Sequence, residues 1–427
     1  MAGALSDIRV VETSGPIGHY AGRLLADLGA DVIKVEPLVG DPARLYAPFL
    51  PGVEPPENGL QFLLLNANKR SVALDLVSEG GRALFLRLLS TADVLLDSWQ
   101  RPEARALGLD DDALHATRPD LVRASVTGWG LSGPHADWAY ADIVGQAMSG
   151  VMTLAGFPDG PPERIADEQG HTCASINAAA GIVAALLHRD ATGEGQRVEV
   201  AVQEALSMAQ ETAMMSADIL GVDRERNGGL GIGGTRIPGV GLYHAADGFV
   251  YMLAAGTAGS GFEGVLSLMD ALGYRSDLRE EPWATFIRES MNRGLLLQAL
   301  QDPSQVQAIS TRLAHIDEVL RDFCAKHGKR ELYERGQRHR LLIGMVSSPQ
   351  DISESPQLAA REWFVEIDDP KRGRRLRYPG PPWQLRGTPA TLRRPAPLLG
   401  EHTAEVLGEL GATDAELRAQ GVGGVAR

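Results

Sequence analysis

The sequence predicts an α/β protein with a mostly parallel β-sheet. Strand-like and helix-like segments alternate over residues 1–130, which is typical of the crossover units that join parallel strands. Glycines follow the first strand-like segment and precede a helix-like one, as in a Rossmann-like opening. The segment GPIGHYAG lacks the G-x-G-x-x-G pattern, however, so it does not by itself predict a dinucleotide site.

The N-terminal elements follow from their side-chain patterns. Tyr20 to Leu28 carries apolar residues at helical spacing, and Gly29 stands where a helix C-cap belongs. Ser78 precedes a second helical pattern as its N-cap. Four short apolar runs predict strands: Ile8–Glu12, Asp31–Glu36, Asp93–Asp97 and Leu121–Thr127.

The rest of the chain predicts a change of character beyond residue 225. An Ala-rich helix is expected from Ser175 to His188, followed by a turn and a strand from Arg197 to Val202. The segment GLYHAADGFVYMLAAG predicts a β-hairpin that turns near Asp247, and mainly helical patterns follow to Gly328. A Pro-rich segment after residue 340 predicts a long ordered connection, and a helix from His402 to Leu410 closes the fold.

Composition excludes several classes of protein. Of the 427 residues 44% are hydrophobic and 22% charged, as in a folded globular protein with a large and a smaller domain. The formal net charge of −14 argues against a general nucleic-acid binder. Cys173 and Cys324 lie far apart, so we expect neither a disulfide scaffold nor a structural metal site.

The sequence predicts no membrane association. The N-terminal MAGALSDIRVVETS lacks the basic start and apolar run of a signal peptide, so we expect a cytoplasmic protein. The longest apolar stretch, roughly Ile176 to Leu187, is expected to be too short to span a bilayer.

Six motifs, in order along nearly the whole chain, resemble family III CoA-transferases, the CaiB/BaiF-type carnitine and formyl-CoA transferase family. They are AGRLLADLGADVIKVEPLVGDPAR, NANKRSVALDL, SVTGWGLSGP, ADIVGQAMSG, TGEGQRVEVAVQEAL and RRPAPLLGEHTAEVLGELG. The resemblance implies a Rossmann-like large domain built from both chain ends, a smaller α+β domain, and an interlocked homodimer. The implied domains are residues 1–225 (CoA-binding), 226–335 (small) and 336–427 (linker and return to the large domain).

The resemblance also implies contacts for each part of CoA, which has phosphates, an adenine and a long pantetheine arm. The loop Pro16, Ile17, Gly18 corresponds to the family loop at the arm, and Arg44 to a family arginine placed for phosphate. Trp138 replaces a common Lys or Arg, so it predicts weaker phosphate binding or stacking on a ring. The other implied contacts are Leu74, Val77, Ser98, Trp99 and Arg105.

The family nucleophile is an Asp whose carboxylate attacks the acyl-CoA thioester and later holds CoA as an aspartyl thioester. Counting back from Gly181 of GIVAALLHR, and forward from Arg164 of PPER, places His171 at this position. A carboxylate is required because only a protein acyl group can hold CoA as a thioester, and an acyl-imidazole cannot become one.

Three alternatives follow from His171. Asp167 or Glu168 can replace the nucleophile, so that the protein still transfers CoA between carboxylic acids. His171 can instead serve as a base, with Asp142 or Asp167, in an acyl-CoA isomerase, racemase or lyase. The third alternative is a non-catalytic CoA-binding partner subunit of a hetero-oligomer. We expect CoA transfer, with acyl-CoA and a carboxylic acid as substrates and no metal.

Overall fold

The computed structural model describes residues 2–226, 228, 236–254, 259–291 and 303–420, which form two compact units. The large unit comprises Met1–Val151, Arg164–Glu211 and Pro356–Arg427, so it includes both the N-terminal and the C-terminal segment. The small unit comprises Met152–Glu163 and Thr212–Ser355. The first two segments of the large unit build the sheet and the candidate site described below.

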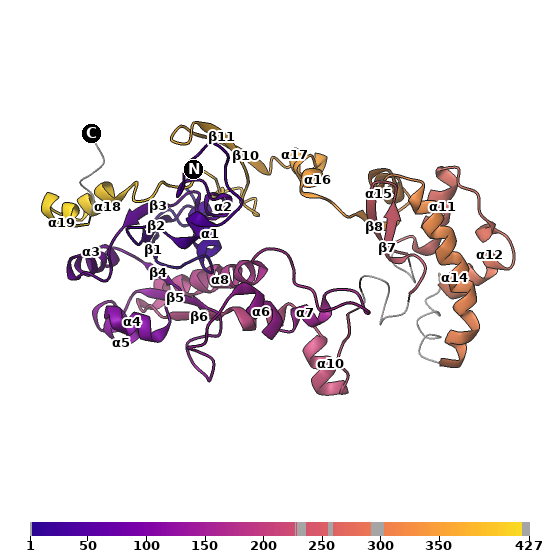
Figure 1. Ribbon diagram of the computed structural model, residues 1–427, viewed down its shortest axis with the longest axis horizontal. Helices are drawn as coiled ribbons and strands as arrows, with labels where there is room; N and C mark the ends of the chain where they lie inside the picture. Colours follow the sequence, from indigo (N-terminus) through magenta and orange to yellow (C-terminus); the bar gives the residue numbers. More distant parts are fainter. Residues whose placement is uncertain (1, 227, 229–235, 255–258, 292–302, 421–427) are drawn as a thin grey trace. The chain divides into compact units, whose positions relative to one another are not determined.

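A six-stranded sheet forms the centre of the large unit (Figure 1). Its strand order is β3-β2-β1-β4-β5-β6 and every pairing is parallel. This confirms the predicted α/β fold with a parallel sheet, and the order is that of a doubly wound sheet. The strands are β1 (Arg9–Glu12), β2 (Asp31–Glu36), β3 (Arg70–Ala73), β4 (Val94–Asp97), β5 (Val122–Thr127) and β6 (Arg197–Ala201).

Helices cover both faces of this sheet because alternate strand residues point to opposite sides. On one face, α1 (His19–Asp27) and α8 (Gln169–Thr192) pack on a core that includes Val10 and Leu96. On the other face, α3 (Glu79–Leu89) and α18 (Thr403–Glu409) pack on a core that includes Val11 and Leu95. Ser78 caps α3 as predicted, since its Oγ accepts from the backbone N–H of Gly81 at 3.0 Å.

Helix α8 is longer than the sequence predicts, with 24 residues from Gln169 to Thr192. By length and composition alone it could cross a membrane, so the expectation of a short apolar segment is wrong. Small side chains such as Ala178 and Ala185 are nonetheless buried against the sheet, as in a core helix. A Cβ at Gly181 would lie 2.7 Å from Val198 Cγ1, so this close approach requires glycine.

The C-terminal segment is more regular than the predicted connection. It contains an antiparallel hairpin of β10 (Phe364–Asp369) and β11 (Arg374–Pro379). The final helices are α18 and α19 (Asp414–Ala419). Arg70 Nη1 on β3 donates to Glu405 Oε1 and to Glu409 Oε1, each at 2.9 Å, and thereby fixes α18 against the sheet edge.

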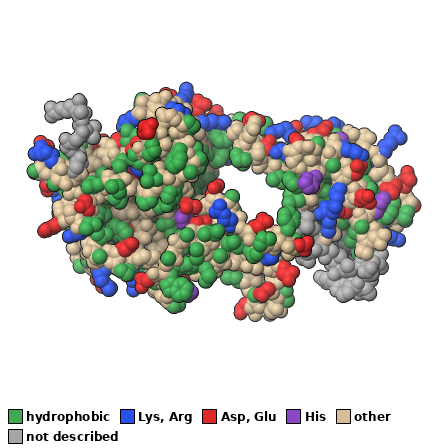
Figure 2. All heavy atoms as spheres, in the orientation of Figure 1, with side chains coloured by type: hydrophobic (Ala, Val, Ile, Leu, Met, Phe, Trp, Pro, Cys, Tyr) green, Lys and Arg blue, Asp and Glu red, His purple; other side chains and the backbone are tan. Residues whose placement is uncertain are grey.

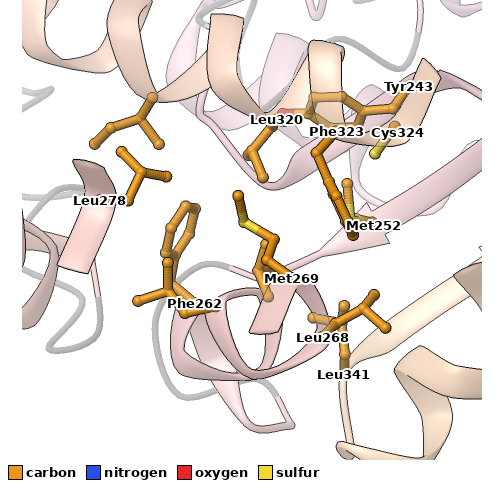
Figure 3. Packing of buried hydrophobic residues seen from close by; sticks show 14 of the residues in the cluster. Tyr243, Met252, Phe262, Leu268, Met269, Leu278, Leu320, Phe323, Cys324 and Leu341 are labelled. Atoms are coloured by element: carbon orange, nitrogen blue, oxygen red, sulfur yellow. The ribbon is translucent and has the colours of Figure 1, made fainter. Parts of the chain in front are cut away.

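The small unit is built on an antiparallel sheet in the order β7-β8-β9. Strands β7 (Val240–Ala245) and β8 (Gly248–Leu253) form the predicted hairpin, and β9 (Leu342–Met345) pairs with β8. Figure 3 shows its core, in which Phe262, Leu320 and Cys324 lie among other apolar side chains. Burial raises the pKa of the Cys324 thiol to about 12, so this cysteine is a packing residue.

The remaining elements are short segments that connect these layers. In and beside the large unit they are η1 (Pro42–Leu45), α2 (Leu60–Asn66), α4 (Arg101–Leu107), α5 (Asp111–Thr117), α6 (Asp142–Met148), α7 (Val151–Leu154), α9 (Val202–Met208) and α17 (Pro356–Ala360). In the small unit they are α10 (Ala213–Leu220), α11 (Gly261–Ala271), η2 (Asp277–Arg279), α12 (Trp283–Phe286), the π-helical turn η3 (Ile287–Met291), α14 (Pro303–Ala325), α15 (Lys329–Arg338) and α16 (Pro349–Ser353).

Candidate active site

The loop after β1 lies at the point where the strand order reverses, between β1 and β4, where doubly wound sheets bind ligands. The backbone N–H of Gly15 donates to Ser98 Oγ at 3.0 Å, which ties the loop to the end of β4. Ser175 Oγ donates to the carbonyl of Ile17 at 3.0 Å, which ties it to α8. A Cβ at Gly18 would lie 2.6 Å from the Ser14 side chain, so the loop packs too closely for any side chain there.

A hollow of about 700 Å³ opens beside this loop, at the N-terminus of α8. Its walls come from the loop itself, from η1 and α2, and from the segment that leads into α8. Figure 2 shows acidic, basic and histidine side chains among hydrophobic ones on the visible face of the large unit. Of the predicted site residues, Pro16, Asp167 and His171 all line this hollow, and Glu168 lines it with them.

Glu168 is the N-cap residue of α8 and lines the hollow. Gln61 Nε2 donates to its Oε2 at 2.8 Å, and His171 Nδ1 lies 3.1 Å from the same Oε2. The contact with His171, helped by the hydrogen bond from Gln61, lowers the pKa of Glu168 below its ordinary value, against the effect of partial burial. Glu168 is therefore ionised at neutral pH.

Asp142 has a different role from Glu168. Its Oδ1 accepts from the backbone N–H of His171 at 3.0 Å, and its Oδ2 accepts from Gln146 Nε2 at 2.7 Å. Asp142 is 7% exposed, and its carboxylate accepts from a backbone N–H in the first turn of α8 that has no acceptor within the helix. A Cβ at Gly170 would lie 2.7 Å from Asp142 Oδ1, so this approach also needs glycine. Asp142 thus holds the first turn of α8 in place, and its catalytic role stays a prediction.

Asp167 lies on the rim of the same hollow. It has a backbone φ of +61°, which is uncommon for a residue with a side chain, and its side chain is exposed. Among the described residues it makes no hydrogen bond or ion pair, so nothing holds its carboxylate in one position.

A second hollow, of about 730 Å³, lies between α4 and the loop after β5. Arg101 and Arg105 line it together with Ser132, Gly133 and Asp137. Two guanidinium groups suit phosphate oxygens. Arg105 was predicted from the sequence and Arg101 was not, although Arg101 lies one helical turn before it and this spacing places both on one face of the helix.

Several residues implied as CoA contacts lie elsewhere. Arg44 is fully buried, with its guanidinium hydrogen-bonded to Glu36 and Glu57, so it has no group exposed for a phosphate. Leu74 is buried in the sheet core, whereas Val77 is 80% exposed.

The remaining implied contacts lie near the end of β4 or beyond β5. Ser98 Oγ accepts the hydrogen bond from the backbone N–H of Gly15, and Trp99 packs edge-on against Phe85. Trp138 is exposed and stacks on His135, with ring centroids 3.8 Å apart.

Beneath the loop lies a buried polar network that the sequence analysis did not identify. Lys34 Nζ lies 2.8 Å from His19 Nε2 and 2.9 Å from Asp41 Oδ2, and Lys69 Nζ lies 2.7 Å from Glu12 Oε2. Burial lowers the pKa of Lys69 to about 8, and burial and Lys34 lower the pKa of His19. His19 is therefore neutral, and its contacts fix the start of α1 below the hollow.

The arrangement suits a thioester cofactor with an anionic end. One hollow carries the ionised carboxylate of Glu168 at a helix N-terminus, and the other carries two arginines. Within the described ranges, no group of three His, Cys, Asp or Glu side chains could hold a metal ion.

Comparison with known proteins identifies the family. The model of CoA-transferase family III matches residues 5–403. The chain belongs to this family. It is an enzyme that transfers CoA between carboxylic acids, with CoA thioesters as substrates.

Relatives and solved structures agree with this assignment. The chain is 34% identical to succinyl-CoA:(R)-benzylsuccinate CoA-transferase subunit BbsE of Thauera aromatica, over 95% of this chain and 94% of the relative. It is 33% identical to formyl-CoA:oxalate CoA-transferase of Streptomyces avermitilis, over 98% of each. A crystal structure of a CaiB/BaiF family protein from Brucella suis has a TM-score of 0.80 and 25% identity, covering 96% of this chain and all of that one.

Proposed function

We propose that this family III CoA-transferase uses Glu168 as the carboxylate that carries CoA. We assign His171 to the position of the family aspartate from its spacing to Gly181 and Arg164, and an imidazole cannot form the thioester that the exchange requires. A different carboxylate in the same hollow must then supply the acyl group.

One observation carries this proposal. The contacts of the Glu168 carboxylate with Gln61 and with His171 are both made by Oε2, and within the described structure Oε1 has no hydrogen-bond partner. The carboxylate is thus oriented through one oxygen, ionised, and able to attack with the other. In Asp142, by contrast, both oxygens accept hydrogen bonds, and Asp167 is not held in place.

The proposed reaction consists of two successive acyl-transfer stages at Glu168. Oε1 attacks the thioester carbon, CoA leaves as a thiolate, and a mixed anhydride forms. The thiolate attacks the glutamyl carbonyl and releases the first acid, which leaves a glutamyl-CoA thioester. The carboxylate of the second acid attacks that thioester, which releases the CoA thiolate and forms a second mixed anhydride. The thiolate then attacks the acyl carbon of the second acid, which gives the new acyl-CoA and restores the Glu168 carboxylate. The N-terminus of α8 favours the negative charge that develops at each step.

We also propose that at least one substrate is a dicarboxylic acid. The names of three relatives give benzylsuccinate, oxalate and glutarate as acids on which those proteins act. The exchange needs only one carboxylate of such an acid, so the second is available for recognition.

A hetero-oligomer with a related subunit is the second candidate. It is favoured by the name of BbsE, which is a subunit, and by our assignment of His171 to the position of the family aspartate. We propose an oligomer in either case, since Ile176 and Leu187 on the outer side of α8 are 51% and 67% exposed. In the hetero-oligomer the partner would carry the nucleophile and Glu168 would be dispensable.

Glu168→Gln tests the proposal, with Asp167→Asn as its matched control. Glutamine keeps the length of the side chain but cannot form the anhydride, so CoA transfer should fall by on the order of 10⁴-fold or more. Asp167→Asn should stay within about threefold of the wild type. Wild-type rates in Glu168→Gln, with the purified chain alone, would reject Glu168 as the nucleophile. Activity only after addition of a related subunit would favour the hetero-oligomer.

A further inference from the structure

The hollow at Glu168 has an apolar wall formed by η1 and α2. Leu45 is 60% exposed, Leu60 37% and Leu64 39%, and all three line the hollow. Leu60 and Leu64 lie one helical turn apart, so they present one continuous surface. A strongly polar ligand would leave this surface without a partner, whereas burial of an apolar group against it is favourable.

Tyr46 connects this wall to the carboxylate. It lines the same hollow and is 39% exposed. Burial raises the pKa of its hydroxyl, and the negative charge of Glu168 raises it further, so the phenol and the carboxylate share one environment. An acyl group held on Glu168 as the mixed anhydride would therefore extend along Tyr46 and the leucines.

Arg164 is the one Lys or Arg that lines the hollow, four residues before Glu168. It is exposed, and within the described parts of the chain it makes no hydrogen bond or ion pair. Nearly every other basic group close to the site is already paired, as Arg44 is with Glu36 and Lys69 with Glu12. An unpaired guanidinium beside an apolar wall fits a ligand that has an apolar body and a separate carboxylate.

We propose that this enzyme selects acids in which an apolar body carries a second carboxylate, and that Arg164 is the specificity residue that binds the second carboxylate. The inference rests on the proposed function, because it places the reacting carboxyl group at Glu168. The two arginines of the other hollow remain available for the phosphates of CoA, so the two anionic ends of an acyl-CoA are recognised at separate places.

Three acceptor acids separate the two parts of this proposal. Phenylsuccinate has the apolar body and two carboxylates, 3-phenylpropanoate lacks one carboxylate, and succinate lacks the ring. Phenylsuccinate should have a KM at least about 10-fold below that of either of the others, since a charge-assisted contact and a buried apolar group each contribute that much. Equal KM values for the three acids, or a preference for an acid with an ammonium group, would overturn the proposal.

Arg164→Gln should raise the KM for phenylsuccinate by about 10- to 100-fold and leave that for 3-phenylpropanoate within about twofold. Arg164→Lys should restore part of the loss, because it keeps the charge without the planar fork. Leu64→Ser should remove the advantage of phenylsuccinate over succinate. An equal effect of Arg164→Gln on the diacid and the monoacid would overturn the role of Arg164.

A binding measurement keeps this result separate from the fate of Glu168. Saturation-transfer NMR, with CoA present, reports whether each acid binds even when nothing is transferred. If Glu168→Gln abolishes transfer while the preference for phenylsuccinate in binding persists, both proposals stand. If Glu168→Gln transfers CoA normally but the binding preference persists, only the nucleophile assignment fails. Loss of the binding preference alone overturns the inference about the second carboxylate.

Discussion

Substitution of Arg44 tests whether this residue has a structural role or binds CoA. Its Nε and Nη2 donate to Glu36 Oε2 at 2.7 Å and Oε1 at 2.8 Å, and Nη1 donates to Glu57 at 2.9 Å. Its guanidinium also lies 3.9 Å from the centre of the Phe62 ring. Arg44→Met keeps the volume but leaves the fully buried carboxylate of Glu36 without this partner. Loss of one member of a buried ion pair costs about 3–5 kcal/mol in the free energy of unfolding.

The difference in stability between the wild type and Arg44→Met should change with pH in a defined direction. Burial raises the pKa of Glu36, but the hydrogen bonds and charge of Arg44, together with Lys34, hold it below its ordinary value. In the wild type, Glu36 therefore contributes stability above its unfolded pKa, and this is lost as the pH falls through the lower folded pKa. In Arg44→Met, burial dominates and Glu36 can accept a proton. The difference in stability between the two proteins should therefore shrink as the pH falls from 7 toward 4.5.

Thermal unfolding and CoA titration together form the assay. Arg44→Met should lower the melting temperature of the large unit by at least about 6 °C. In the fraction that stays folded, its affinity for CoA should match that of the wild type. Arg105→Gln, on the exposed side of α4, should do the opposite, with roughly 10-fold weaker CoA binding and an unchanged melting temperature. Normal stability of Arg44→Met with weakened CoA binding would refute this reasoning.

Two further predictions concern the hollow and the helix below it. His171→Gln removes the contact that lowers the pKa of Glu168, so the acid limb of the kcat/KM profile should move to higher pH; an unmoved limb would show that Glu168 is not the group that titrates. Gly22→Ala would place a Cβ 1.9 Å from Glu12 Oε2 in the buried network, so the free energy of unfolding should fall by about 1–3 kcal/mol. Gly193 has open space around it, so Gly193→Ala should cost only the strain of its left-handed backbone.

The predicted parallel strands were found because each is a short segment with Val, Ile, Leu or Ala at its centre that alternates with helical patterns along the chain. Asp31–Glu36 was predicted to the residue, and the strand predicted at Leu121–Thr127 begins one residue later in the structure. The hairpin Phe364–Pro379 was missed, since half of the residues of its second strand, RRLRYP, are charged and half are exposed. A pattern of that kind is hard to separate from a polar loop without knowing its partner strand.

The candidate site was predictable only in part. Pro16, Asp167 and His171 were named from the sequence and line one hollow in the structure. Gln61 was missed because it is 107 residues from Glu168 in the sequence, and only folding brings them to 2.8 Å. Arg44 was placed at a phosphate because it corresponds to a family arginine in GDPAR, but no sequence pattern shows that Glu36 is buried beside it. The division into domains at residues 225 and 335 stays a prediction.

Mapping the covalent intermediate is the most direct test of CoA transfer through Glu168. The purified enzyme would be incubated with an acyl-CoA alone, trapped with borohydride or hydroxylamine, and digested for mass spectrometry. The peptide that contains Glu168 should carry the modification at that residue, and Glu168→Gln should carry none. Modification at Asp167, at a residue of a second subunit, or nowhere with any acyl-CoA that the enzyme turns over would contradict the account.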